Sequence, residues 1–226
     1  MWNSLLVENL VNDLAQMALF YGIASNEIGA LLDCVAANVV TFKKGDIIIE
    51  AGSEVAEFGI MLSGQSRSIK WDQSGRLIII TFIEKGDVLG VMRAAKADHP
   101  SPVFVEATMD STVMFIPFSR VIARCEKNCF RHEQFLQNYI SEVAEKGLEL
   151  YERINCLLEP TVRDKILVFL SRISRDKQSK SFEIPMDRNA MAEYLNIERS
   201  SLSRELSRMK RDGLIEYNRS SFSLLI

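Results

Sequence analysis

The sequence predicts an α+β protein with an N-terminal antiparallel β-barrel or jelly roll, a long dimerisation helix and a C-terminal winged helix-turn-helix. Three observations predict this order. Short apolar runs separated by turns fill residues 37–117, an apolar repeat with helical spacing covers residues 130–159, and two helices with a β-hairpin follow in residues 184–226. A run of strands followed by a run of helices is typical of separate domains.

The first third of the chain changes from a helical pattern to a strand pattern. Residues 1–36 carry apolar side chains at helical spacing, and Ser25 offers an N-cap for a second short helix. Glycines such as Gly45 and Gly86 lie in the turns of the following region, where corners need a positive φ. Short strands at such regular spacing indicate an antiparallel barrel or jelly roll. The predicted strands are residues 39–42, 47–50, 58–62, 66–71, 77–83, 88–91, 103–109 and 113–117.

A long helix is predicted over residues 130–159, because apolar residues recur there at alternating spacings of four and three. Such a heptad-like seam predicts a two-helix dimer interface, although the same stripe also suits a helix that lies on the barrel, and both can hold. Pro160 ends the helix, so residues 159–160 are the predicted domain boundary and hinge. The seam residues are Leu136, Ile140, Val143, Gly147, Leu150, Ile154 and Leu157.

The last 43 residues predict two helices joined by a tight turn and followed by a hairpin. Asp187 is a residue of N-cap type, and Asn196 tolerates the left-handed backbone that the turn needs. The second helix runs from about residue 198 to residue 211 and ends before Gly213. Its apolar face comprises Leu202, Leu206 and Met209, and the predicted hairpin strands are residues 214–217 and 222–226.

The opposite face of that second helix is rich in Arg and Ser, with Glu205 as the only carboxylate between residues 199 and 211. A solvated surface helix is the alternative, but a major groove accepts such a face, because Arg bonds guanine edges and Ser is small. The distribution of charge along the chain supports binding in a major groove. Residues 160–226 hold 13 Lys and Arg against 9 Asp and Glu, whereas residues 1–159 hold 14 against 21.

The sequence resembles the Crp/Fnr family of bacterial transcription regulators. The likeness is carried by Arg188, the dipeptide Ser203-Arg204 and the segment 211–215, and by the Lys-Gly-Asp and Leu-Ser-Gly turns of the barrel. It implies a sensory barrel in residues 1–129, a dimerisation helix in 130–159 and a DNA-binding domain in 160–226. It also implies double-stranded DNA, a second copy of the chain, an effector and, for an activator, RNA polymerase as partners.

The resemblance assigns roles in DNA binding residue by residue. Arg199 and Arg204 are expected to contact bases with Ser203 beside them, and Arg188 matches a position that contacts phosphate. Backbone contacts are expected from Ser200, Ser201 and Arg208. Many relatives carry Glu at the position of Ser200, and this difference weakens the transfer of the family's usual operator to this chain.

The cAMP-binding cassette of the family is not intact in this sequence. In members that bind cAMP, a Gly-Glu pair and a later Arg-Ser pair hold the ribose and the phosphate, through a carboxylate and a cation respectively. Here Val91 stands at the Glu position, Ser101-Pro102 replaces the Arg-Ser pair, and Leu148 and Glu149 stand where Thr and Ser are expected. Arg93 is a candidate for a displaced phosphate ligand. An effector other than cAMP, or none, is therefore expected.

The cysteines and histidines predict no resident cofactor. Four Cys lack the grouping of an iron–sulfur site, and His99 and His132 form no metal constellation with other residues. Cys125 and Cys129 read either as buried apolar residues or as a thiol redox switch. An enzyme built on the barrel is a further alternative, but the chain lacks a His-rich metal site, a phosphate loop and a triad.

Composition predicts a soluble cytoplasmic protein. The chain is 47% hydrophobic and 25% charged, and no apolar run approaches the roughly 20 residues that span a membrane. The first residues lack the pattern of a signal peptide. The expected function is a homodimeric regulator under effector control, with a constitutive DNA-binding protein or a thiol-switched regulator as alternatives.

Overall fold

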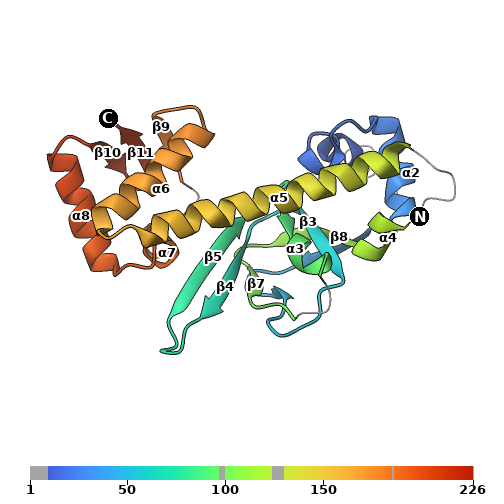
Figure 1. Cartoon of the computed structure of the whole chain (residues 1–226), viewed down its shortest axis with the longest axis horizontal. Coiled ribbons are helices and arrows are strands. Elements are labelled where there is room, and N and C mark those ends of the chain that lie inside the picture. Colours follow the sequence, from blue (N-terminus) through green and yellow to red (C-terminus); the bar gives the residue numbers. More distant parts are fainter. Residues whose placement is uncertain (1–9, 97–99, 124–129, 185, 226) are drawn as a thin grey trace. The chain divides into compact units, whose positions relative to one another are not determined.

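The computed structural model describes residues 10–96, 100–123, 130–184 and 186–225 (Figure 1). The described chain divides into two compact units. The first comprises residues 1–70 and 81–147, and the second comprises residues 71–80 and 148–226, so the division falls inside the long helix and at the tip of one hairpin. The predicted boundaries at residues 129/130 and 159/160 remain a prediction.

The first unit contains two four-stranded antiparallel sheets, apart from residues 71 and 77–80 of the second sheet, as the predicted pattern of short apolar runs and turns indicates. One sheet has the order β1-β8-β3-β6 and the other β2-β7-β4-β5, so strands distant in sequence are neighbours in each sheet. The central pairing of the first sheet sets Phe58 opposite Ile116 and Ile60 opposite Met114. The strands are β1 (Asn38–Phe42), β2 (Ile47–Ile49), β3 (Glu57–Ser63), β4 (Ser66–Trp71), β5 (Leu77–Ile83), β6 (Val88–Leu89), β7 (Phe104–Ala107) and β8 (Ser111–Pro117).

Two apolar clusters stabilise this unit. The first cluster is formed by side chains of both sheets and includes Met61, Leu89 and Val113. The second cluster combines strand residues such as Phe58 with residues of the helices. The second cluster includes Phe135 of the long helix, which is fully buried. Burial of such side chains stabilises the fold by about 1.5–3 kcal/mol each.

Short helices accompany the barrel. The described ones are η1 (Ala18–Phe20), α2 (Ser25–Cys34), α3 (Val91–Ala94) and α4 (Phe118–Ile122), and α5 (Phe130–Leu158) follows. Two local predictions were wrong. Ser25 is the first helical residue of α2 rather than its cap, and Val91 begins α3 instead of ending a strand, because Gly90 adopts φ 69° and turns the chain.

The second unit contains the C-terminal helices and a three-stranded sheet of order β10-β11-β9. Its elements are α6 (Val162–Asp176), β9 (Ser181–Glu183), α7 (Arg188–Tyr194), α8 (Arg199–Arg211), β10 (Ile215–Asn218) and β11 (Ser221–Leu224). Thr161 caps α6, since its side chain accepts a hydrogen bond from the backbone N–H of Asp164.

The break at Glu159 and Pro160 is confirmed, because α5 ends at Leu158 and α6 begins at Val162. Bonds cross this break within the second unit. Nη2 of Arg175 lies 2.8 Å from Oε1 of Glu152, and Sγ of Cys156 lies 3.2 Å from the carbonyl oxygen of Lys165. The last turns of α5 are therefore attached to α6 in this conformation.

Candidate nucleic-acid interface

Helix α7 and the turn after it position the second helix of the motif. The side chain of Asp187 accepts a hydrogen bond from the N–H of Ala190 at 2.8 Å, so the predicted N-cap is confirmed. Asn196 has φ 51°, which confirms the left-handed turn residue. The backbone N–H of Ile197 bonds the carbonyl of Ala192 at 3.0 Å and closes the turn. These local bonds fix the entry into α8.

Helix α8 presents an apolar face to its own unit and a polar face to solvent. The side chains of Leu202, Leu206 and Met209 are fully buried, as their spacing predicts. Gly213, at φ 74°, ends the helix region after its C-cap at Asp212. The opposite face is exposed at Arg199, Ser200, Ser203, Arg204, Ser207 and Arg208, and Ser201 is partly buried. The structure therefore brings the predicted α8 residues onto one surface.

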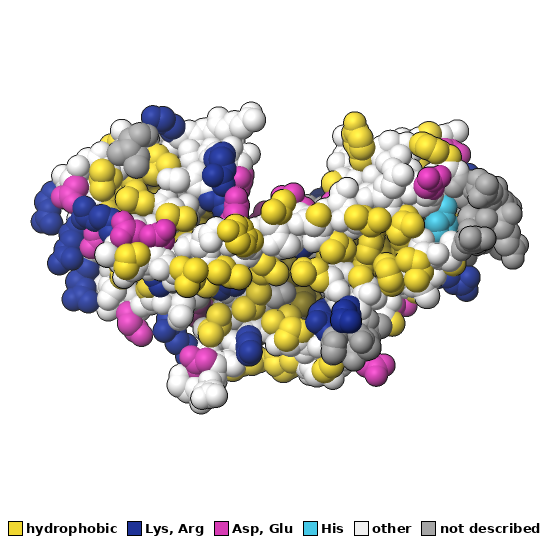
Figure 2. Space-filling view, in the orientation of Figure 1, with side chains coloured by type: hydrophobic (Ala, Val, Ile, Leu, Met, Phe, Trp, Pro, Cys, Tyr) yellow, Lys and Arg dark blue, Asp and Glu magenta, His cyan; other side chains and the backbone are white. Residues whose placement is uncertain are grey.

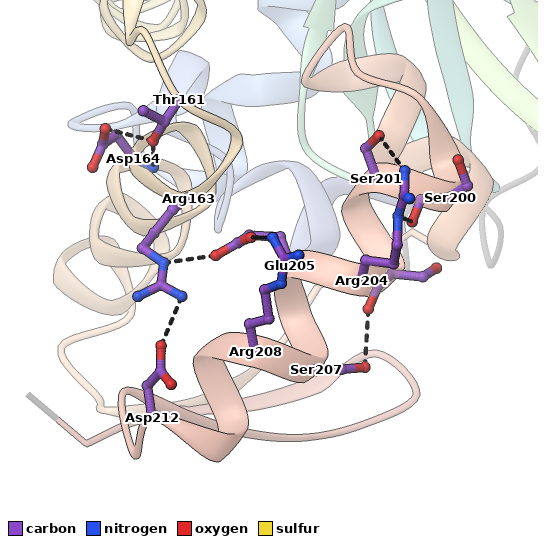
Figure 3. Close-up of polar contacts among 11 residues, drawn as sticks. Thr161, Arg163, Asp164, Ser200, Ser201, Arg204, Glu205, Ser207, Arg208 and Asp212 are labelled. Atoms are coloured by element: carbon purple, nitrogen blue, oxygen red, sulfur yellow. Dashed lines mark hydrogen bonds and ion pairs between the residues drawn. The ribbon is translucent and has the colours of Figure 1, made fainter.

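Two hollows lie along this polar face. The first, of about 410 Å³, is lined only by residues of α8: Ser203, Arg204, Ser207, Arg208 and Arg211. Figure 2 shows Lys and Arg side chains gathered over the helix. The guanidinium of Arg204 is held by its own helix, with Nη2 3.3 Å from Oγ of Ser201 (Figure 3). Arg204 is thus oriented before any ligand arrives.

The only carboxylate of α8 is directed away from that hollow. Nε of Arg163, on α6, lies 2.6 Å from Oε1 of Glu205, and Nη2 of the same guanidinium lies 2.7 Å from Oδ2 of Asp212 (Figure 3). The two carboxylates raise the pKa of Arg163. Arg208 also contacts Glu205, at 3.3 Å. The negative charge of Glu205 is therefore neutralised beside α6, which sequence reasoning missed because Arg163 is 42 residues away.

The hairpin adds a third cation to the second hollow. This hollow, of about 650 Å³, is lined by residues that include Arg188, Arg199 and Arg219. Arg219 lies in the β10–β11 turn with φ 51° and was missed as a site residue, because its proximity to the helices is a tertiary contact. The guanidinium of Arg188 lies over two neighbouring rings, 4.9 Å from the centroid of Tyr217 and 4.8 Å from that of Phe222.

Burial of Arg188 has a consequence for its predicted role. Desolvation lowers the pKa of its guanidinium, and its Nη2 has no hydrogen-bond partner among the described residues. Arg188 joins α7 to the hairpin and faces the hollow that contains Arg199. A phosphate contact by Arg188 stays a prediction.

Comparison with known families agrees with this geometry. The model of the cyclic nucleotide-binding domain matches residues 39–128, and that of the Crp-like helix-turn-helix domain matches residues 164–225. The chain belongs to the Crp/Fnr family. It is a DNA-binding transcription regulator of the Crp/Fnr type.

Individual relatives are distant but extend over most of the chain. The anaerobic regulatory protein of Haemophilus influenzae is 24% identical over 189 residues, which cover 81% of this chain and 71% of that protein. The fumarate and nitrate reduction regulatory protein of Escherichia coli is 23% identical over 207 residues, which cover 89% of this chain and 80% of that protein.

Solved structures share the fold. FixK2 from Bradyrhizobium japonicum has a TM-score of 0.64 at 20% identity and covers 83% of this chain and 92% of its own. A CooA mutant from Carboxydothermus hydrogenoformans has a TM-score of 0.68 at 17% identity, with 87% and 86% covered. The fold prediction is therefore confirmed.

In the barrel of this Crp/Fnr protein, the two main positions of the cAMP cassette carry an apolar side chain and a hydroxyl that is already hydrogen-bonded within the protein. The side chain of Val91 is buried, and its carbonyl accepts the hydroxyl of Tyr139 at 2.5 Å. Ser101 is also buried, and its Oγ donates to the carbonyl of Val103 at 2.7 Å. Neither position supplies the carboxylate or the cation that a ribose phosphate needs. Absence of cAMP binding remains a prediction.

The predicted seam of α5 divides into two parts in the structure. Leu136 and Val143 pack against the core of the first unit, whereas Ile140 is 59% exposed and Ile154 53% exposed. Leu150 and Leu157 are partly buried, as is Gly147. Three further apolar residues that the strict repeat missed are exposed: Leu148, Tyr151 and Leu158. An α-helix drifts by about 20° per heptad against a straight seam, which shifts the exposed stripe toward them.

The described cysteines and histidine form no metal centre. No group of three or more His, Cys, Asp or Glu that could hold a metal ion occurs in the described ranges. Cys125, Cys129 and His99 lie outside the described residues. His132 is buried, because α2 and α4 cover the start of α5. Among the helices that the structure describes, none is both long and apolar enough to cross a membrane.

Proposed function

We propose that this protein is a homodimeric regulator that binds a pseudo-palindromic operator under the control of an effector other than cAMP. The observation that carries the proposal is the polar face of α8. It exposes Arg204 and Arg208 beside small serines, while Arg163 holds the intervening Glu205 away. Arg side chains in that setting suit guanine edges and phosphates of a major groove.

The second hollow supports a two-part footprint on each half-site. Arg199 begins α8 and Arg219 lies at the hairpin tip, so the helix is expected to enter the groove while the hairpin reaches the adjacent backbone. Arg219 is accordingly proposed as a phosphate contact. Two copies related by two-fold symmetry would read half-sites about one helical turn apart.

The exposed stripe of α5 supports self-association. Figure 2 shows hydrophobic side chains along this helix, and Ile140, Tyr151 and Ile154 are each more than half exposed. In the described chain, a Cβ added at Gly147 would meet no heavy atom within 4 Å, so a second helix has room there. A buried apolar seam of this kind stabilises parallel helix pairs.

Control by the barrel completes the proposal. An effector acts only if it binds the DNA-competent state more tightly than the other state. The protein is proposed to need no resident metal or haem, to act in the cytoplasm, and to contact RNA polymerase if it activates transcription.

Selection of genomic DNA with the purified full chain tests the proposal. The selection is run at fixed salt, in air and under reducing anaerobic conditions, with an Arg199→Ala/Arg204→Ala variant as the matched control. We expect wild-type protein to enrich a palindrome and the variant not to. Equal enrichment by both proteins would contradict the assigned face, and sedimentation of the complex tests for two chains per operator.

A further inference from the structure

Two reactive side chains meet where α2, α4 and α5 come together in the first unit. Sγ of Cys34, the last residue of α2, lies 3.6 Å from Nδ1 of His132 on α5. Nε2 of His132 lies 2.8 Å from the carbonyl oxygen of Val121 on α4. His132 is buried, whereas Cys34 is partly exposed and remains a thiol. Neither residue belongs to the DNA interface.

The contact with Val121 fixes the tautomer of His132. A carbonyl oxygen only accepts, so Nε2 of the ring carries the hydrogen that it donates. Nδ1 of the neutral ring is then an acceptor, and it faces the thiol of Cys34. Transfer of the thiol proton to Nδ1 would give a thiolate beside an imidazolium, the pair that activates cysteine nucleophiles.

The other charges near this pair do not replace His132 as the base. The charged residues of α2, of α4 and of the first turn of α5 are Glu27 and Asp33, Arg120, and Arg131 and Glu133, respectively. Glu27 and Arg131 neutralise each other, with an N–O distance of 3.2 Å. Cys34 ends its helix, where the helix dipole disfavours a thiolate. An imidazolium at His132, in contact with the sulfur of Cys34, would offset this effect.

We propose that Cys34 is a modification site, a thiol that His132 activates for reaction with hydrogen peroxide. The Cys34 thiolate attacks one peroxide oxygen, so an S–O bond forms and the O–O bond breaks. Sulfur gives up two electrons and becomes a sulfenic acid, and peroxide is reduced. The hydroxide that leaves takes the proton from the imidazolium and departs as water, which returns His132 to its neutral form.

Cys156 provides an internal comparison. Its side chain is buried, its Sγ donates to the carbonyl of Lys165 at 3.2 Å, and burial raises the pKa of the thiol. Such a thiol is expected to react slowly. A difference between Cys34 and Cys156 therefore reports the effect of their surroundings within one molecule.

Alkylation of the reduced full chain by iodoacetamide, mapped by peptide mass spectrometry, tests the activation. Mapping separates Cys34 from the other three cysteines, and rates are measured from about pH 5 to about pH 9. At about pH 6.5 we expect Cys34 of the wild type to react about tenfold faster than Cys34 of His132→Gln, because a thiolate fraction near 1% rises about tenfold when the pKa falls by one. Equal rates and equal pH profiles in the two proteins would overturn the proposal.

Two measurements keep the test decisive if His132→Gln does not fold. The first is the wild-type profile alone, in which Cys34 should reach its plateau well below the ordinary thiol pKa of about 8.5. The second is exposure of wild-type protein to hydrogen peroxide followed by dimedone, which should label Cys34 before Cys156. A pH profile of Cys34 alkylation with the ordinary thiol pKa, or equal dimedone labelling of Cys34 and Cys156, would contradict the proposal.

Discussion

Arg163 of α6 holds Glu205 of α8 through an Nε–Oε1 contact of 2.6 Å, and this contact pairs the only carboxylate of that helix with a cation. The same guanidinium reaches Asp212, which follows α8, at 2.7 Å. One side chain thus pairs with one acid near the middle of the helix and with another just after its end. The Arg and Ser face is left with a positive charge that a phosphate backbone attracts.

Replacement of Arg163 by Ala should lower operator affinity severalfold, because Glu205 would then repel phosphate from within the interface. The measurement is fluorescence anisotropy with operator DNA at two salt concentrations. Arg175→Ala is the matched control, since Arg175 pairs with Glu152 away from α8. Recovery of affinity in Arg163→Ala/Glu205→Gln would support the electrostatic reason, and unchanged affinity in Arg163→Ala would contradict it.

Arg204→Ala and Arg208→Ala should differ in kind. Because Arg204 is proposed to contact a base, its replacement by Ala should weaken the binding free energy for the specific site by about 1–3 kcal/mol and relax the base preference. Arg208, as a phosphate contact, should weaken binding to all sequences and reduce the salt slope by about one. Competition binding against a base-substituted operator set distinguishes them. Identical losses of preference in both variants would refute the division of roles.

Leu206→Ala should destabilise the second unit by about 2–5 kcal/mol, because it removes a fully buried side chain from the apolar face of α8. Thermal or denaturant unfolding followed by circular dichroism measures the loss. The exposed neighbour Ser207→Ala serves as the control and should stay within about 0.5 kcal/mol of the wild type. A loss of similar size in both variants would argue against this packing.

Ile154→Asp should convert the protein from dimer to monomer, since it places a charge in the exposed apolar stripe of α5. Sedimentation velocity at several protein concentrations reads the oligomeric state. Ser141→Asp, on an exposed polar position of the same helix, should leave the dimer intact. A dimer of unchanged stability in Ile154→Asp would move the interface elsewhere.

Asp110→Asn should alter the acid side of the stability profile. Hydrogen bonds from the side chain of Lys43 and the backbone of Lys44 lower the pKa of Asp110 in the folded protein. A lowered folded-state pKa stabilises the fold above the unfolded-state pKa of about 3.9 and loses this effect as pH falls through the folded value. At neutral pH the wild type should therefore unfold at a higher denaturant concentration than the variant. In acid the two unfolding midpoints should converge.

The measurement for Asp110 is the denaturant midpoint of both proteins from about pH 7 to about pH 2. The exposed surface position makes the effect small, and salt should reduce it further. A gap between the two proteins that widens as pH falls would have the wrong sign and would refute the assignment.

Local sequence signals determined much of this protein. The caps at Thr161 and Asp187, the left-handed turn at Asn196 and the buried stripe of α8 were predictable, because each depends on residues within one or two turns of the chain. Short apolar runs and glycine corners likewise identified the barrel strands to within a few residues.

Only the tertiary structure decided which distant side chains meet. The Arg163–Glu205 contact spans 42 residues and the Cys34–His132 contact spans 98, so no periodicity within an element reveals either. The exposed stripe of α5 was partly misplaced for the same reason, because Leu136 and Val143 are taken up by the barrel core. Sequence encodes the faces of each element, whereas packing between elements selects which face is buried and which charges are neutralised.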